Sequence, residues 1–600
     1  MKSFLRRRIG SVTLPLSGGE ATGEGVAAAA VPPGTQDREG GNMGFIGVRS
    51  HRSSNHRVGF VVATGVAVIA MLGVAGVGVA ASGPVLSRSG PSNEGPYPYG
   101  YPASGGIKAG TGTTLSGAKC KAGTPQFASA YVAPCLPKFT GNNGGATYNG
   151  VTSSTITLAQ IEYPQSANEQ SLEAQAAAAG DAPQPVISQV EQTFLNYFNK
   201  AYELYGRHVV IKPVTATGKS LDEALDQGQA QACADATTVA QQVHAFGETG
   251  IPYELQGGGS NPFSNCAVQQ HLVEFEGNPY YGENIFQSQN PYVWSTVPSC
   301  TNIAAQMAEV IGKELAGKKA IYAGGALKSQ TRKFATFIPN INSYIGCNGN
   351  SSSTEVKLLQ SKYHVPISAI NTFFHYDLNI ATFSQSAQQA IVQFKAAGVT
   401  TIVAACDPFS LGLLTKAADQ QNYFPEWLLE GTAATDTDNE GQTYDQTAVD
   451  GHMFGVSEAN ATNDIFGPTS PAGKLYQKLT GHQIPPETDG NYGILVEIFD
   501  MLQAAGPKLT PQNMSRGTHA LPVLGAPNFS YGAWSWNVGP TGKSGAGEHS
   551  SLIDARFVWW NGTAKSPVNG MPGTFVASDN GHRWGLGQWP KTMPAVFTSS

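Results

Sequence analysis

From Thr155 onward, short β-rich runs alternate with longer segments whose apolar residues recur at helical spacing. The run Thr155–Glu162 (TITLAQIE) predicts a strand. Residues 185–204 predict a helix that Gly206 would end, and Arg207–Val214 predicts a second strand. Strands that alternate with helices of this length predict parallel sheets with helices on both faces, so we expect an α/β fold.

The same alternation continues toward the C-terminus. The sequence predicts helices over residues 236–246, 303–315, 383–397, 411–421 and 492–506, and strands over 319–323, 400–405 and 427–430. About 450 residues are too many for one such sheet. We therefore expect a body over 151–600 with two Rossmann-like lobes, lobe I over about 151–300 and 455–520, and lobe II over about 301–454 and 521–600.

The N-terminal part carries an uncharged run from Val58 to Ala81, which is long enough to span a bilayer as a helix. Arginines in the basic polar leader of residues 1–57 would orient that leader to the cytoplasm. Val79-Ala80-Ala81 before Ser82 fits a signal-peptidase site. A cleaved signal peptide and a retained anchor both fit, and Met43 would be the alternative start that gives a short basic leader. A buried core helix is the other reading of the run.

Residues 82–150 are rich in Gly, Pro, Ser, Tyr and Asn, which predicts a flexible linker between this run and the body. Cys120 and Cys135 could staple its end. The chain has seven cysteines and no CxxC pair. Spread cysteines in an exported protein favour disulfides, and the odd count leaves at least one thiol free or paired between chains.

Composition and motifs exclude several kinds of function. The chain is 41% hydrophobic and 13% charged, with a net charge of −6, which argues against nucleic acid as a partner. There is no HExxH motif and no paired metal spacing among the 12 histidines. Gly542-Lys543-Ser544 lacks the first glycine of a P-loop. We expect no cofactor, no metal and no catalysis. Trp559-Trp560 could stack on a ligand or lie in the core.

Several segments, in their order along the chain, resemble the branched-chain amino-acid (Leu/Ile/Val-type) solute-binding proteins of ABC importers, which have the type I periplasmic-binding fold. The resemblance covers about residues 151–600. Its clearest stretch is FKAAGVTTIVAACDPFSLGLLTKAADQQNYFPEWLLEG, followed by YGILVEIFDMLQAAGPKLTPQNM. The opening strand TITLAQIE and the segment CADATTVAQQV also resemble the family's first strand and a later helix.

The resemblance implies two lobes joined by hinge strands, which close around a small polar ligand in an interlobe cleft. An amino acid, an amide or a similar solute would be delivered to an ABC permease or sensed outside the cytoplasm, by a monomer. It also implies a disulfide between Cys233 and Cys266, although two unrelated buried thiols would fit the sequence as well.

Candidate ligand contacts follow the predicted strand ends, because ligands of open parallel sheets bind outside the carboxyl ends of the strands. Backbone N–H groups of the Gly-rich turn could hold a carboxylate, although a flexible loop fits too. Asp407 is our candidate for a ligand ammonium; its alternative role is to cap the helix that starts near Ser410. The complete set is Tyr163, Gln165, Ser166, Gly258, Gly259, Ser260, Gly324, Gly325, Asp407, Phe409, Thr432 and Asp436.

Two other functions compete with solute binding. One is a cell-surface interaction module that keeps the binding fold but has lost its ligand. The other is an exported hydrolase, which would need a nucleophile beside a base, and no such motif is visible in the sequence.

Overall fold

The computed structural model describes residues 99, 107–164, 170, 182–224, 227–250, 261–276, 281–431, 433–457, 468–485, 488, 490–525, 532–537 and 549–598. The expected leader, the apolar run at 58–81 and the residues around Gly542 lie outside these ranges. None of the helices inside them is both long and apolar enough to cross a membrane.

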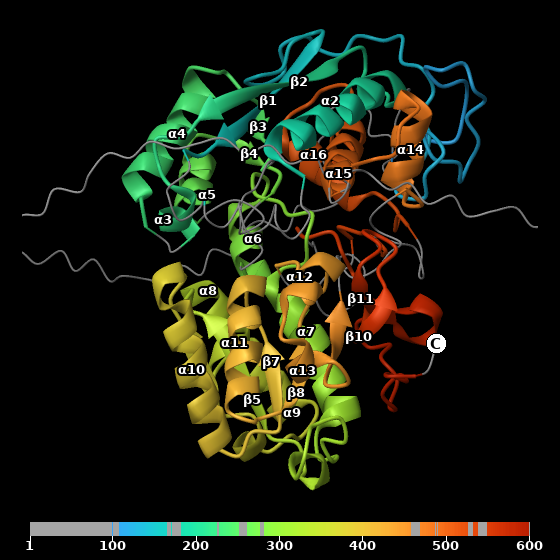
Figure 1. Ribbon diagram of the computed structural model, residues 1–600. Helices are drawn as coiled ribbons and strands as arrows, with labels where there is room; N and C mark the ends of the chain where they lie inside the picture. Colours follow the sequence, from blue (N-terminus) through green and yellow to red (C-terminus); the bar gives the residue numbers. More distant parts are fainter. Residues whose placement is uncertain are drawn as a thin grey trace, which may run out of the picture. The chain divides into compact units, whose positions relative to one another are not determined.

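The first sheet has four parallel strands in the order β2-β1-β3-β4. Their bounds are β1 Thr155–Glu162, β2 His208–Thr215, β3 Gly247–Glu248 and β4 Val273–Glu274 (Figure 1). The strand predicted at Thr155–Glu162 is confirmed with the same bounds. Its side chains alternate between two cores: Ile156 and Leu158 join one, and Ala159 and Ile161 join the other. This sheet is therefore covered on both faces.

Helices from two distant parts of the chain cover the first face. α2 (Gln184–Ala201) packs against α14 (Pro471–Thr480) and α15 (Gly490–Ala504), and α15 packs against α16 (Pro511–His519). Aromatic rings join them, since Phe198 lies 5.7 Å from Tyr492 and 5.5 Å from Phe499 between ring centroids. The other face carries α3 (Ser220–Ala224), α4 (Gln229–Gln241) and α5 (Asn261–Gln269).

The second sheet has eight strands, and a run of five of them is parallel. β5 (Phe334–Pro339), β6 (Phe373–Tyr376), β7 (Thr401–Ala404), β8 (Glu426–Leu429) and β9 (Met453–Ser457) lie in the order β9-β8-β7-β5-β6. Ile402 and Leu429 point into one core, while Val403 and Leu428 point into another. The chain thus forms a mixed α/β structure with parallel sheets.

Helices cover both faces of the second sheet as well. The long ones are α7 (Cys300–Val310), α10 (Ile380–Ala396) and α11 (Pro408–Gln420). The shorter ones are η1 (Ile311–Leu315), η2 (Leu327–Ser329), α8 (Asn342–Tyr344), η3 (Ile345–Gly349), α9 (Thr354–Ser361), η4 (Ile367–Ala369), α12 (Asp438–Thr443) and α13 (Gln446–Val449). A further short helix, α6 (Glu283–Gln289), packs beside α5 instead, where Gln289 Nε2 donates to Asn265 Oδ1 at 3.0 Å.

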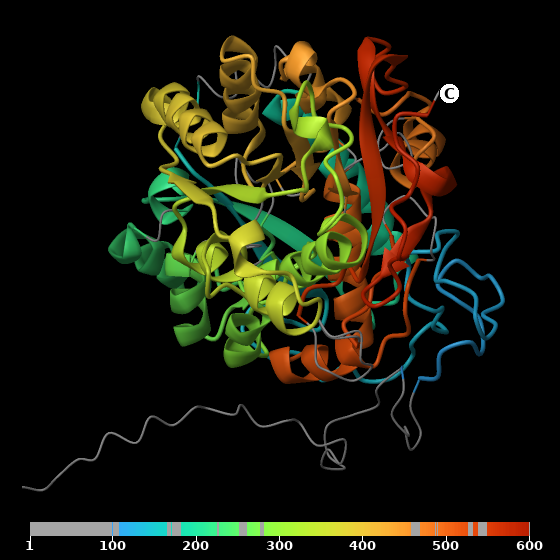
Figure 2. The ribbon, with the colours of Figure 1, turned by 90° about the horizontal axis from the view of Figure 1, so that it is seen from below.

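The last strands of the second sheet are antiparallel, which the sequence did not predict. β10 (Asp554–Lys565) pairs with β9 on one side and with β11 (Pro572–Ala577) on the other. β12 (Arg583–Gly585), which follows the short helix η5 (Ser578–Gly581), pairs with the start of β10. Figure 2 shows this long hairpin in red. Trp559 and Trp560 lie on β10 and are buried, so they belong to the core.

The strand predicted at 319–323 is wrong. Only Lys319 makes an isolated bridge, to Thr331, and the following residues form turns. The sheet position is instead occupied by β5, all six of whose residues are buried. The sequence of β5, FATFIP, ends in proline, which argues against a strand in a single-sequence reading.

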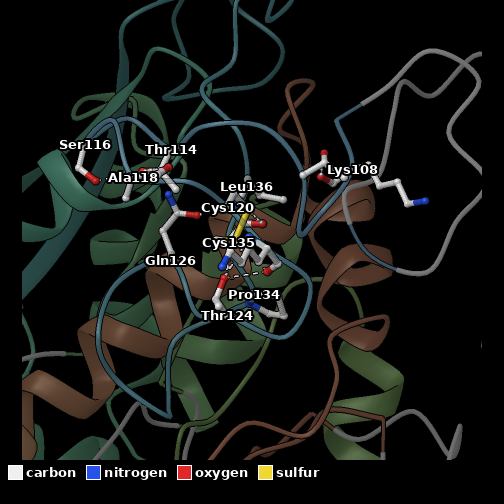
Figure 3. The surroundings of a disulfide bond; sticks show 12 residues. Lys108, Thr114, Ser116, Ala118, Cys120, Thr124, Gln126, Pro134, Cys135 and Leu136 are labelled. Carbon is white, nitrogen blue, oxygen red and sulfur yellow. Dashed lines mark hydrogen bonds between the residues drawn. A yellow bond between two sulfur atoms is a disulfide. The ribbon is translucent and has the colours of Figure 1, made fainter.

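Residues 107–150, predicted as part of a linker, pack onto the first core. Tyr131, Val132 and Leu136 are buried in it, and Ala133 N donates to Asp500 Oδ1 at 2.8 Å. Figure 3 shows the Cys120–Cys135 disulfide that closes the segment, with Leu136 N donating to Gln126 Oε1 at 2.7 Å. Few apolar side chains suffice here because a disulfide and buried hydrogen bonds hold the irregular backbone.

Three disulfides are present: Cys120–Cys135, Cys233–Cys266 and Cys300–Cys347. The first two are the expected pairs, and the second joins α4 to α5. The remaining cysteine, Cys406, is free and buried. It therefore faces the protein interior, which leaves no accessible thiol for pairing between chains.

The two cores draw on residues that the expected lobe boundaries would separate. Leu524, Trp534 and Leu552, expected with lobe II, belong to the core of the first sheet. The chain passes from the first sheet to the second for the last time at about residue 553, where β10 begins. The division into lobes is otherwise a prediction.

Candidate functional site

In the described part of the chain, two segments join the carboxyl ends of the two sheets. The last residue of β4, Glu274, forms a parallel bridge with Val293, and Ser295 forms one with Ser550. The second segment leads directly into β10, where Arg556 pairs with Ser457, the last residue of β9. We call residues 293–297 and 549–553 the crossing segments. They run from the carboxyl edge of the first sheet to the carboxyl edge of the second, which is where ligands of such sheets bind.

At the carboxyl edge of the second sheet, Asp407 lies where the sequence predicts it, just after β7. Its Oδ1 accepts the Ser410 N–H at 2.9 Å, so it caps α11, and its Oδ2 accepts the Tyr376 hydroxyl at 2.6 Å. The capping role is therefore present, and both carboxylate oxygens have donors from the chain itself. Phe409, in the first turn of α11, is half-buried against the core.

Glu430, which sequence reasoning missed, follows β8 and is fully buried. It accepts the Tyr344 hydroxyl at 3.0 Å and a hydrogen bond from Asn348. Burial raises the pKa of this carboxyl to about 8 despite these donors. The nearby Cys406 thiol also has a raised pKa, because it is buried and lies near Asp407 and Glu430. Asp436 is fully buried in the turn before α12, and Thr432 lies outside the described residues.

At the carboxyl edge of the first sheet, Tyr163 lies just after β1 as predicted. Its hydroxyl donates to Glu223 Oε2 at 3.0 Å. The other candidates here, Gln165, Ser166, Gly258, Gly259 and Ser260, lie outside the described residues, so their contacts stay predictions.

Buried carboxyl groups dominate this first edge. Glu248 ends β3 and Glu274 ends β4, and the two are neighbours in register. Glu276 follows, and it accepts hydrogen bonds from Thr296 of a crossing segment. Burial raises the pKa of Glu248 to about 7 and that of Glu276 to about 8, and raises that of Glu274 well above its usual range. These glutamates lie in two separate short sequences, GE and VEFE, and only the strand register brings them together.

A second polar contact ties the crossing segments to the first half of the chain. His549 Nδ1 lies 2.9 Å from Glu283 Oε1 at the start of α6, and both side chains are 3% exposed. Ser295 N donates to His549 O at 2.8 Å, and Ser551 Oγ donates to Thr296 O at 3.1 Å. The crossing segments are therefore hydrogen-bonded to one another as well as to the first sheet.

Gly324 and Gly325 do not lie at a strand's carboxyl end, because residues 319–323 form no strand. Gly324 N donates to Phe424 O at 2.8 Å, just before β8 begins. A side chain at Gly324 would meet Phe424 at 2.7 Å, so the glycine permits a close approach of two loops. The prediction that these glycines follow a strand end is wrong, and they lie at the amino end of β8.

Within the described ranges, no group of three His, Cys, Asp or Glu side chains could hold a metal ion. The polar groups of the two edges are hydroxyls, amides and carboxyls. Such groups can bind a polar or cationic solute through hydrogen bonds and charge.

No protein-family model matches the sequence, and no curated protein matches it either. Substrate-binding proteins of ABC transporters are among the solved structures that match. A leucine-, isoleucine-, valine-, threonine- and alanine-binding protein from Brucella ovis is 12% identical and has a TM-score of 0.46, with 74% of this chain and 99% of that chain covered.

Two further matches are of the same kind. A substrate-binding protein from Aeropyrum pernix is 12% identical, with a TM-score of 0.47 and coverage of 72% and 96%. A solute-binding protein from Rhodopseudomonas palustris BisB5, solved with 3,4-dihydroxy benzoic acid, is 13% identical, with a TM-score of 0.45 and coverage of 72% and 98%. The sequence resemblance named this same group of proteins.

Proposed function

We propose that this chain is an extracytoplasmic solute-binding protein, which captures a small polar ligand between the carboxyl edges of its two sheets. The observation that carries the proposal is the pair of crossing segments, 293–297 and 549–553. They connect the carboxyl edge of one parallel sheet to that of the other, so both edges can contribute to one site. Short extended segments held by single β-bridges at such a junction suit hinge closure around a ligand.

The proposal includes no catalysis by this site. A released solute would pass to a membrane permease or to a sensor, and the apolar run at 58–81 would serve export or anchoring. The type I periplasmic-binding fold, with lobes that move as units, belongs to this proposal.

Thermal unfolding of the purified chain, with its disulfides intact, tests the proposal against amino acids, amides, polyamines, sugars and aromatic acids. A ligand that binds only the folded state raises the free energy of unfolding by about 2.7 kcal/mol at 100 times its dissociation constant. A melting temperature that rises with one chemical class supports solute binding. No rise with any class contradicts it.

One observation favours a second function, a surface interaction module without a ligand. Both oxygens of Asp407, the acid expected to bind an ammonium, accept hydrogen bonds from the chain itself. If no solute binds, protein partners at the cell surface become the next class to test.

A further inference from the structure

Four buried glutamates gather at the carboxyl edge of the first sheet, and we call them the carboxyl cluster: Glu223, Glu248, Glu274 and Glu276. They are between 0% and 4% exposed. Glu248 and Glu274 are register neighbours on parallel strands, so their side chains leave the sheet on the same face. Glu223 comes from α3, which packs on α5 over that face. The cluster is thus built by separate elements that meet at one edge.

Three members of the cluster have hydrogen-bond donors from the chain. Glu248 accepts the Gly250 N–H at 2.7 Å, Glu223 accepts the Tyr163 hydroxyl, and Glu276 accepts hydrogen bonds from Thr296. These contacts fix the side chains in place around the fourth member.

Glu274 differs from the other three. It is 0% exposed, and no hydrogen bond of normal geometry reaches either of its carboxyl oxygens. Ser264 of α5 is its polar neighbour and is 0% exposed too, and its hydroxyl likewise lacks a hydrogen bond of normal geometry. Buried polar groups are expected to be paired, because leaving them unpaired is costly. A carboxyl group and a hydroxyl beside it thus suit a donor from outside the chain.

The charges around the cluster are all of one sign. The charged groups that act on Glu274 are the other three glutamates, and Glu497 of α15 interacts with Glu276. Tyr163 after β1 faces Glu223 and Glu248 as a neutral phenol, since its pKa is raised well above its usual value, and Asp235 of α4 lies near Tyr163. No lysine, arginine or histidine of the described ranges is among the groups acting on Glu248, Glu274 or Glu276. The cluster therefore suits a positively charged ligand.

The arrangement also distinguishes between kinds of cation. The described acids form no group of three that could hold a metal ion. An organic cation with separated ammonium groups can instead reach carboxyl groups that stand apart. We propose that the carboxyl cluster binds a di- or polyamine, with one ammonium at Glu274 and another toward Glu276. This inference rests on the proposed solute-binding function and names its ligand class.

Isothermal titration of the full chain at pH 8.5 tests the inference, with putrescine and spermidine as diamine and polyamine probes and butylamine as the monoamine. We expect both polycations to bind and butylamine to bind more weakly. Glu274→Gln should weaken their binding by about tenfold to a hundredfold, since a charge-assisted hydrogen bond is lost. Equal binding of butylamine, or no binding of either polycation, overturns the inference.

Glu314→Gln is the matched control. Glu314, on η1, is also buried, with no hydrogen bond to either carboxyl oxygen, and burial raises its pKa to about 8. It belongs to the elements of the second sheet, so its replacement should leave polyamine binding unchanged. An equal loss of binding in both variants would mean that the effect is general, and would overturn the inference.

A pH series on the unmodified chain gives a second measurement that does not depend on a variant folding. Ammonium groups pair with ionised carboxyls, so polyamine binding should strengthen as the pH rises from 6.5 to 8.5, through the pKa values of Glu248 and Glu276. A flat profile overturns the inference. If polyamines fail while another solute class stabilises the chain, this inference fails and the proposed function stands; if no class binds, both fail.

Discussion

The hydroxyl of Tyr376, at the carboxyl end of β6, donates a 2.6 Å hydrogen bond to Oδ2 of Asp407, the residue that caps α11. Both groups are buried. The contact holds the end of β6 against the start of α11, which follows β7, two positions away in the sheet. Both carboxylate oxygens of Asp407 are thus used within the chain, so its first role is to stabilise the local structure.

Replacement of Asp407 by Ala should destabilise the chain by about 1–3 kcal/mol, because a helix cap and a buried acceptor are both lost. Asp407→Asn should cost less, since Asn also caps helices. Urea unfolding measures the difference. Asp445→Ala is a control, because Asp445 caps α13 in the same way but has no such partner hydroxyl. Unchanged stability in Asp407→Ala would contradict the capping role.

The stability of the chain should fall as the pH rises from about 4.5 to above 8, in part because of Glu430. Its pKa of about 8 in the folded state exceeds the usual value, so the folded state holds a proton that the unfolded state has released. The stabilisation is complete below the unfolded pKa and is lost as the pH passes the folded one. Glu430→Gln should therefore gain on the order of 1 kcal/mol relative to the parent at pH 9 but not at pH 4.5. Equal stability differences at both pH values would contradict this account.

Breaking the buried ion pair of Arg332 and Glu426 should strongly lower the free energy of unfolding. Arg332 Nε donates to Glu426 Oε2 at 2.7 Å and Nη2 to Oε1 at 2.8 Å, and the side chains are 3% and 0% exposed. Arg332→Met should cost about 3–5 kcal/mol, because it leaves a buried charge without its partner. Adding Glu426→Gln should recover part of that loss. A double variant less stable than the single one would contradict this explanation.

Cys406 should be inert in the native state. It is buried, and burial raises the pKa of its thiol, which lowers the thiolate fraction. Under non-reducing conditions, a thiol reagent should label no site in native protein and one site per chain in denaturant. A Cys406→Ala variant should give none in either state. Rapid labelling of the native chain would contradict the burial of this thiol.

The sequence pattern predicted the regular elements well where side-chain periodicity was clear. The bounds of β1 are those predicted, and the helix predicted at residues 185–204 corresponds to α2, which ends earlier, at Ala201. Gly206 does not end this helix: Tyr202 is its C-cap, and Gly206, with φ of 83°, lies in the turn just before β2. β5 was missed because its run FATFIP ends in proline, which argues against a strand. Residues 107–150 were misjudged because composition says nothing about a disulfide-closed loop that packs on a distant helix.

Only part of the candidate site could be predicted, because some of its residues come together through tertiary packing and not through a sequence pattern. Asp407 and Tyr163 follow strands that periodicity reveals, so their places at the sheet edges could be predicted. Glu248 and Glu274 end strands of only two residues each, and they become neighbours through inter-strand register alone. Register between such short strands is set by tertiary packing, and single-sequence patterns do not contain it.

The position of the crossing segment at 549–553 has a consequence for the order of events during synthesis. The core of the first sheet begins with residues near the start of the body, yet it also needs α15, Trp534 and Leu552. The second sheet needs β10, which follows them. Neither core can close until more than nine-tenths of the chain has left the ribosome. A nascent chain would thus stay unfolded late into translation, which is the state that an unfolded-chain export channel accepts.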